Sequence, residues 1–169
     1  GLPRFFMVGL PDAAVRESRD RVMAAIKNSG QIFPPNKRVT CNLAPADLRK
    51  EGPAYDLPIA VGILAASRQV WPEGLEEALF VGELSLDGAV RPCKGVVLHA
   101  ALARRLGFQR IFVPAENAAE AALIPEVEVI PVTHLQELVG HLTRLGEIAP
   151  AAVDVGALTN EEVQYAADF

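Results

Sequence analysis

A Gly-Pro turn opens directly into an apolar helix in the stretch Lys50-Glu51-Gly52-Pro53-Ala54-Tyr55-Asp56-Leu57-Pro58-Ile59-Ala60. The helix predicted over residues 55–67 is apolar on nearly all sides, so we expect it to be buried at the centre of the fold. Pro58 falls in its first turn, where proline is tolerated. An enzyme can hold a catalytic hydroxyl at such a helix N-terminus, but Ala54 occupies that place. The stretch therefore predicts a site-like turn without an evident nucleophile.

The length and composition indicate one soluble globular domain with a tail. The chain has 169 residues, 50% of them apolar and 22% charged, which is sufficient for a sizeable core. No apolar run approaches the roughly 20 residues of a membrane span, and no secretion signal precedes the first predicted strand. The two cysteines, Cys41 and Cys93, form no disulfide framework. We expect buried thiols and a cytoplasmic location, with no metal site and no membrane partner.

Charge is distributed unevenly along the chain. Residues 1–50 carry nine Lys and Arg against four Asp and Glu, whereas residues 51–169 carry seven against seventeen. A basic segment on an acidic protein is typical of a surface that binds a polyanion or an acidic neighbour. A solvated helix face explains the same pattern, and the sequence leaves both interpretations open.

The first third of the chain alternates predicted strands and helices. Residues 5–8 form an apolar strand, and Asp12 caps a helix that continues to about Ile26. Asn28-Ser29-Gly30 ends this helix. Residues 38–43 alternate as a half-buried strand.

The remaining pattern contains one hairpin and several short elements. Residues 79–86 are predicted as a single strand, and Asp87-Gly88 is a strong turn signal before the return over residues 89–92. Further helices are expected over 95–106, 116–123 and 135–145, and strands over 110–113 and 127–132. This irregular alternation favours an α+β two-layer sandwich over a doubly wound parallel sheet. We assign residues 1–145 to the domain and 146–169 to a linker.

Most familiar catalytic motifs are absent from the sequence. No G-x-x-x-x-G-K-[ST] phosphate loop, G-x-G-x-x-G or H-E-x-x-H occurs. Of the three histidines, His134 and His141 have a spacing typical of one helix face. Two candidate regions remain, the turn at 51–56 and the hairpin with its following helix at 82–99.

Several long motifs of the chain resemble one bacterial family. The matching segments are residues 1–3, 8–12, 15–19, 42–53 and 80–88. They are similar to the amino-terminal domain of the YifB/ComM family, magnesium-chelatase-like AAA+ ATPases with a ChlI-type domain. The resemblance implies a ribosomal protein S5 domain 2-like fold, related to the Lon proteolytic domain. It also implies an AAA+ domain beyond Phe169 that holds ATP and Mg, so the chain itself is expected to need no cofactor.

The Lon likeness also implies where a catalytic dyad would lie. The nucleophilic Ser of the Lon turn corresponds to Ala54, and the general-base Lys, seven residues after the hairpin proline, corresponds to His99. Neither dyad member is present, and an alanine has no atom that a base can activate. We therefore expect no Ser-Lys peptidase activity from a degenerate cleft comprising Glu51, Gly52, Pro53, Ala54, Asp56, Glu83 and His99.

Other chemistry in this cleft remains open at the sequence level. Asp56 and His99 are candidates for an acid/base pair of a hydrolase. The alternative is structural: a charge-assisted hydrogen bond that joins the two loops, or an Asp56 cap on the buried helix. Glu83 is expected to bond the backbone of the Gly52 turn. A magnesium-chelatase-type role follows only from the inherited family name, because no chelating cluster supports it.

The resemblance favours a non-catalytic accessory domain of a hexameric motor that moves branched DNA in natural transformation. Its partners would be its own AAA+ domain, neighbouring subunits and DNA. Candidates for phosphate contacts, which bind without reading base sequence, are the basic residues Arg16, Arg19, Arg21, Lys27, Lys37, Arg38, Arg49 and Lys50. No aromatic residues are interleaved with them, which argues against a stacking platform in this segment.

Overall fold

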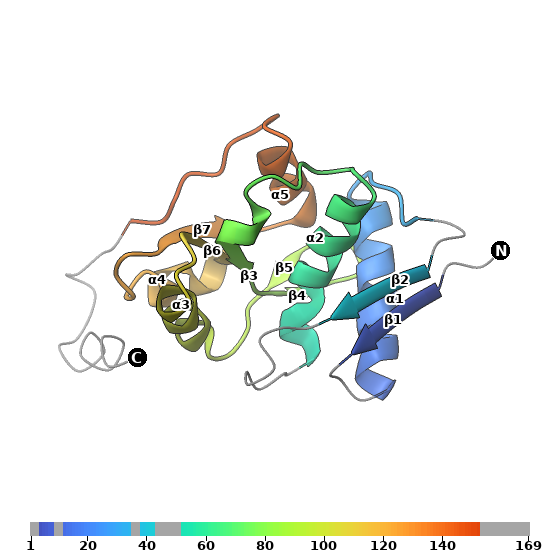
Figure 1. Cartoon of the computed structure of the whole chain (residues 1–169), viewed down its shortest axis with the longest axis horizontal. Helices are drawn as coiled ribbons and strands as arrows, with labels where there is room; N and C mark the ends of the chain where they lie inside the picture. Colours follow the sequence, from blue (N-terminus) through green and yellow to red (C-terminus); the bar gives the residue numbers. More distant parts are fainter. Residues whose placement is uncertain (1–3, 9–11, 35–37, 43–51, 153–169) are drawn as a thin grey trace.

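The computed structural model describes residues 4–8, 12–34, 38–42 and 52–152 (Figure 1). Its helices are α1 (Asp12–Asn28), α2 (Asp56–Ala66), α3 (Val96–Arg105), α4 (Ala118–Ala121) and α5 (Leu135–Leu142), with short 3₁₀ turns η1 (Gly52–Tyr55), η2 (Leu75–Glu77) and η3 (Ala115–Asn117). Its strands are β1 (Arg4–Val8), β2 (Arg38–Asn42), β3 (Ala78–Phe80), β4 (Glu83–Leu84), β5 (Val90–Arg91), β6 (Arg110–Pro114) and β7 (Glu128–Val132).

The described strands pair in three groups. β3, β6 and β7 form a parallel sheet with β6 in the middle, and β1 pairs with β2 in parallel. β4 and β5 form an antiparallel hairpin. The mixture of helices, parallel strands and a hairpin confirms the expected α+β class.

The parallel sheet is covered on both faces, which the two-layer expectation does not include. Phe112 and Ile130 belong to a core with α1, α2 and α5, whereas Ile111 and Val129 belong to a second core with α3 and α4. Successive side chains of a strand point to opposite faces, so neighbouring residues of β6 and β7 enter different cores.

Helix α2 is buried at the centre, as the sequence predicts. Leu57, Ile63 and Leu64 are at most 2% exposed, and α2 lies between α1 and the sheet (Figure 1). Ser67 ends α2, and its hydroxyl donates to the carbonyl of Ile63 at 2.7 Å.

Within the described parts of the chain, no helix combines the length and apolarity needed to cross a membrane.

The single strand predicted over 79–86 is wrong, because the structure divides it at Gly82. β3 pairs with β6, whereas β4 turns away to pair with β5. Between them, Gly82 N–H donates to Ala54 O at 2.9 Å, and its carbonyl accepts from Leu57 N–H at 3.0 Å. The backbone of Gly82 is thus paired with the start of α2 instead of a strand.

The hairpin predicted at Asp87-Gly88 is confirmed. Gly88 has φ +98°, a conformation that side chains rarely adopt. Hydrogen bonds from Ser85 Oγ and Ala89 N–H hold the pKa of Asp87 below its usual value. The hairpin packs against the start of α5, where Leu135 N–H donates to Gly88 O at 2.8 Å.

The chain after α5 returns along the sheet. Ile148 N–H donates to His141 Nδ1 at 3.1 Å, and Ala151 N–H donates to Val129 O at 2.8 Å. Residues 146–152, which the sequence assigns to a linker, therefore pack against β7 and α5.

The close approach at Gly82 leads to a stability prediction. A Cβ at this position would lie 2.8 Å from Val90 Cγ1, and such overlap in a packed core costs about 1–3 kcal/mol. Gly82→Ala is expected to lower the free energy of unfolding by this amount in urea denaturation. Gly62→Ala is the matched control, because a Cβ on this exposed α2 residue meets nothing within 4 Å and stabilises by about 0.5–1 kcal/mol.

A double variant identifies the cause of the Gly82 effect. Val90→Ala removes the obstructing methyl group, so Gly82→Ala is expected to cost less in that background, with a coupling of at least about 0.5 kcal/mol. Equal costs in both backgrounds would contradict the steric explanation.

Candidate functional site

The two candidate regions of the sequence lie together at the start of α2. Ala54 lies in η1, partly buried against the core of α3 and α4. The bond from Gly82 N–H to Ala54 O joins this turn to the segment before the hairpin. Gly52 and Pro53 belong to the same 3₁₀ turn, and Glu51 lies outside the described residues.

Asp56 is the polar centre of this region. It is the first residue of α2 and is fully buried. Its Oδ1 accepts from Ser18 Oγ at 2.7 Å and from Arg21 Nη2 at 3.1 Å. Its Oδ2 accepts from Arg21 Nε at 2.5 Å and from Leu84 N–H at 3.1 Å. The carboxylate therefore connects α1, α2 and β4 through four donors.

Opposing effects act on the ionisation of this pair. Burial raises the pKa of Asp56 above its ordinary value, and hydrogen bonds from Arg21, Ser18 and Leu84 lower it in part. The hydrogen bond with Asp56 raises the pKa of Arg21. Four donors around one carboxylate favour its charged form, so we treat Asp56 and Arg21 as an ion pair at neutral pH.

The pair explains why Arg21 differs from the other basic residues of α1. Its side chain is 17% exposed and is directed to Asp56, so it is committed to the interior. Arg16 and Lys27 are exposed, and Arg19 is partly exposed beside Asp20. Of the remaining phosphate-contact candidates, Lys37, Arg49 and Lys50 lie outside the described residues, and Arg38 is described only as backbone in β2.

His99 lies on α3 and bonds its own helix. Its Nδ1 is 3.1 Å from Gly95 O, so Nδ1 carries the proton in this contact. The four donors on Asp56 come from Ser18, Arg21 and Leu84. The geometry thus assigns Asp56 to a structural network with α1 and β4.

Cys93 belongs to the second candidate region, 82–99, but is not among the individual site residues that the sequence predicts. Glu83, in β4, is close enough for its backbone and charge to act on the Cys93 thiol. Burial raises the pKa of Cys93, and the negative charges of Glu83 and Asp56 raise it further. The protonated thiol is a poor nucleophile, so the cysteine supplies no obvious replacement for the missing hydroxyl.

Asn117 fixes the backbone of Cys93. Its Oδ1 accepts from Cys93 N–H at 2.9 Å, and its Nδ2 donates to Cys93 O at 3.1 Å. Nδ2 also donates to Glu120 Oε1 at 2.7 Å, which orients the amide. No sequence motif indicates this interaction, because 24 residues separate the two partners.

Metal-ligand chemistry finds no support in the described part of the chain. There, no three His, Cys, Asp or Glu side chains are grouped so that they could hold a metal ion.

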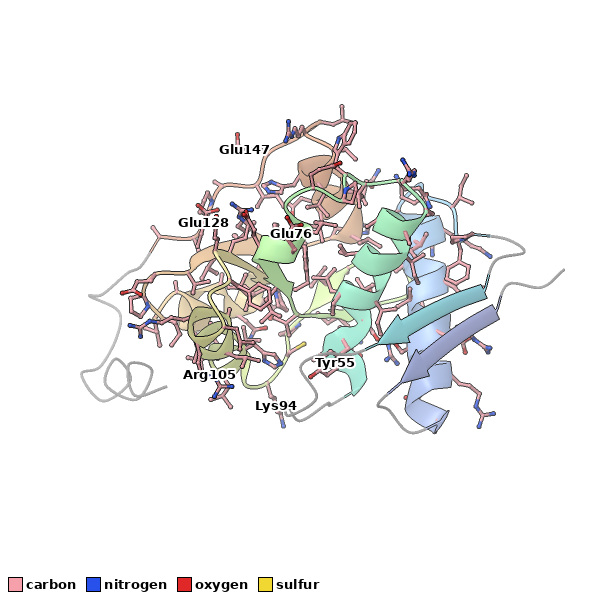
Figure 2. All side chains as sticks on the ribbon, in the orientation of Figure 1. Tyr55, Glu76, Lys94, Arg105, Glu128 and Glu147 are labelled. Carbon is pink, nitrogen blue, oxygen red and sulfur yellow. The ribbon has the colours of Figure 1, made fainter. Side chains whose placement is uncertain are left out.

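Figure 2 shows Lys94 and Arg105 directed away from the body of the protein, at the end where Tyr55 lies.

The buried ion pair leads to a second stability prediction. Asp56→Asn leaves the partly buried Arg21 with only the exposed Glu17, 3.9 Å away, as a counterion, and removal of one partner of a buried pair costs about 3–5 kcal/mol. Urea denaturation is expected to show a decrease of this size. Asp20→Asn, which breaks the exposed ion pair with Arg19, is the control and should change stability by under about 0.5 kcal/mol. Similar small effects for both variants would show that the Asp56 network is not structural.

The sequence is similar to a known family and to several curated proteins. Residues 1–117 match a family model described as subunit ChlI of Mg-chelatase. YifB of Salmonella typhimurium is 51% identical over 142 residues, covering 84% of this chain and 28% of that protein. Competence protein ComM of Haemophilus influenzae is 47% identical over 126 residues, covering 75% of this chain and 24% of that protein.

A more distant relative supports the fold. Lon protease of Rhizobium meliloti is 33% identical over 104 residues, covering 58% of this chain and 13% of that protein. The chain spans about a quarter of the length of YifB and ComM. It belongs to the family of subunit ChlI of Mg-chelatase, with YifB and ComM among its relatives.

Proposed function

We propose that the chain is a non-catalytic accessory domain of a longer ComM-like protein. In this proposal ATP and Mg are bound by an AAA+ part outside the chain, and the domain contributes contacts to DNA or to neighbouring subunits. The name of ComM, a competence protein, supports a role in natural transformation. A hexamer of the full-length protein, with a cytoplasmic location, belongs to the same proposal.

The hydrogen bonds that hold the Asp56 carboxylate are the main support for a non-catalytic role. A general base must reach the proton that it abstracts, but Asp56 is 0% exposed and is held by four donors. Ala54 offers no attacking atom, and burial keeps the Cys93 thiol protonated by raising its pKa. These features support a cleft that holds elements together instead of converting a substrate.

The exposed basic residues of α1 are the described candidates for the DNA contact. Arg16 and Lys27 are exposed and Arg19 is partly exposed, and Glu17 and Asp20 lie on the same helix. Apart from Arg21, the charges of α1 balance, so the proposed contact depends on the exposed basic side chains themselves; the basic residues are Arg16, Arg19 and Lys27, and the acidic ones are Asp12, Glu17 and Asp20. Phosphate contacts of this kind add affinity without base recognition and weaken with salt.

The DNA role predicts a defined salt dependence. Anisotropy of a labelled four-way DNA junction is expected to show binding by the full chain that weakens as salt rises. The triple variant Arg16→Gln, Arg19→Gln, Lys27→Gln should reduce the slope of log affinity against log salt by about 0.9 for each phosphate that it no longer neutralises. Binding at low salt should be weaker than that of the parent chain.

A matched charge control separates a specific surface from general attraction. Arg91, Lys94 and Arg105 are exposed basic residues outside the first fifty. Replacing these three with Gln removes the same charge and is expected to leave the slope unchanged. Equal reductions in both triple variants would contradict binding through α1, and no binding at low salt would leave only the subunit-contact role.

The non-catalytic role predicts no hydrolysis by the chain. Incubation with fluorogenic peptide and ester substrates is expected to give the rate of buffer alone, because the cleft lacks an activated nucleophile. Turnover that disappears in Asp56→Asn or His99→Ala would contradict this proposal. A catalytically active Lon-type enzyme serves as the positive control for the substrates.

A further inference from the structure

An open cavity lies where α2 and α5 end, at the end of the molecule marked by Glu147 (Figure 2). Its volume is about 690 Å³, and its lining includes Arg68, Gln69, Trp71 and Leu145. Trp71 is the single tryptophan of the chain and is 58% exposed. Leu145, which is 89% exposed, lines the same cavity, and exposed apolar side chains grouped in this way are typical of an interaction surface.

Hydrogen bonds fix the wall of this cavity. Gln69 Nε2 donates to Ile32 O at 2.7 Å, and Gln69 Oε1 accepts from Ile32 N–H at 2.8 Å. These bonds connect the loop after α1 to the loop after α2, which runs beside α5 (Figure 1). The position of the Trp71 segment is therefore constrained on the side of α1.

Trp71 also lines a second cavity, of about 250 Å³. Arg144 and Glu73 contribute to that lining. Trp71 thus lies between two hollows, with Arg68 lining one and Arg144 the other.

Both arginines occupy a backbone conformation that favours glycine. Arg68 has φ +59° directly after the C-cap of α2, and Arg144 has φ +63° directly after the C-cap of α5. Glycine is the usual residue at this position of a helix end. Of the three described non-glycine residues with positive φ, two therefore flank Trp71, and the third, Glu126, is absent from the linings of both cavities. Such strain is concentrated at functional sites.

The charges around Trp71 leave the two arginines available. Neither Arg68 nor Arg144 forms an ion pair with a described residue, whereas Arg110 contacts Glu77 at 4.0 Å and Glu128 at 3.8 Å. Glu73 lines both cavities and forms no ion pair with a described residue.

We propose that this face binds single-stranded nucleic acid, with a base stacked on Trp71 and backbone phosphates at Arg68 and Arg144. Non-specific single-strand sites combine basic side chains with aromatic rings on which bases stack. Residues 1–50 do not combine aromatic and basic groups in this way. Around the two cavities, Arg68 and Trp71 come from the segment after α2, and Arg144 comes from the turn after α5.

This inference rests on the proposed DNA role but concerns a different face of the molecule. The contacts proposed on α1 are purely electrostatic, whereas the Trp71 face adds stacking. Variants of the two faces therefore test the two proposals separately. If Trp71 variants leave single-strand binding unchanged while the α1 variants still weaken junction binding, only the single-strand site is refuted.

The single tryptophan allows a direct measurement. Titration of the full chain with oligo-dT of about 15 nucleotides, a length near single-strand site sizes, is expected to quench its intrinsic fluorescence to saturation. Absence of quenching at low salt, while labelled oligo-dT binds in anisotropy, would overturn the assignment to Trp71.

Substitutions of Trp71 test the stacking contribution. Trp71→Ala is expected to weaken binding of labelled oligo-dT by about ten-fold or more, and Trp71→Phe to restore most of it. Leu86→Ala is the control, because Leu86 is 59% exposed and lies on the hairpin. It should leave binding unchanged. Equal effects of Trp71→Ala and Leu86→Ala would contradict the proposal.

Substitutions of the arginines test the phosphate contacts without disrupting folding. The double variant Arg68→Gly, Arg144→Gly relieves two positive-φ positions, so its Tm is expected to be equal or higher. Its affinity for oligo-dT should fall at least about ten-fold, the effect of removing two charged phosphate partners. Glu126→Gly makes the same backbone change outside the cavities, and it should leave binding unaltered. Unchanged affinity in the double variant would contradict the phosphate contacts.

Glu73→Gln provides a change in the opposite direction. Removal of its negative charge is expected to tighten oligo-dT binding several-fold, because Glu73 repels the phosphates. Weaker binding after this substitution would contradict the site. Sedimentation that shows a dimer abolished by Trp71→Ala, with oligo-dT binding unchanged, would assign the face to a second copy of the chain and overturn the proposal.

Discussion

The buried carboxylate of Asp56 is the constraint on which the arrangement of this fold depends. It joins three elements distant in sequence, because Ser18 and Arg21 come from α1 and Leu84 N–H comes from β4. The N-terminus of α2 also favours a negative charge at this position. A charge without these donors would be costly in such a place. The helix, the hairpin strand and α1 are consequently held in one mutual orientation, and the apolar core is packed around it.

The same constraint determines the chemistry of the region around Ala54. Backbone hydrogen bonds join Gly82 to Ala54 in the turn and to Leu57 at the start of α2. The acidic group beside it is neutralised by Arg21, and Asn117 holds the backbone of Cys93 from the other side. The local polar groups are therefore satisfied by one another, which suits a rigid scaffold and leaves little unsatisfied polarity for a substrate.

The sequence predicts what depends on local pattern. The apolar run of α2 and the turn at Asp87-Gly88 determine a buried helix and a hairpin, and both occur in the structure. The interruption at Gly82 has no local signal, because its cause is a tertiary interaction with Ala54 and Leu57. The sequence also does not predict that the Arg21 side chain points inward to Asp56. Its partner is 35 residues away, and a charged residue on a helix gives no local sign of a buried counterion.

β7 is an edge strand of the parallel sheet. An unpaired strand edge offers backbone donors and acceptors to other chains and promotes aggregation. The bond from Ala151 N–H to Val129 O occupies part of that edge. The segment after α5 thus protects the edge from pairing with a strand of another chain. A fragment that ends at Leu145 would lack this protection and should be handled as a self-associating species in any biochemical preparation.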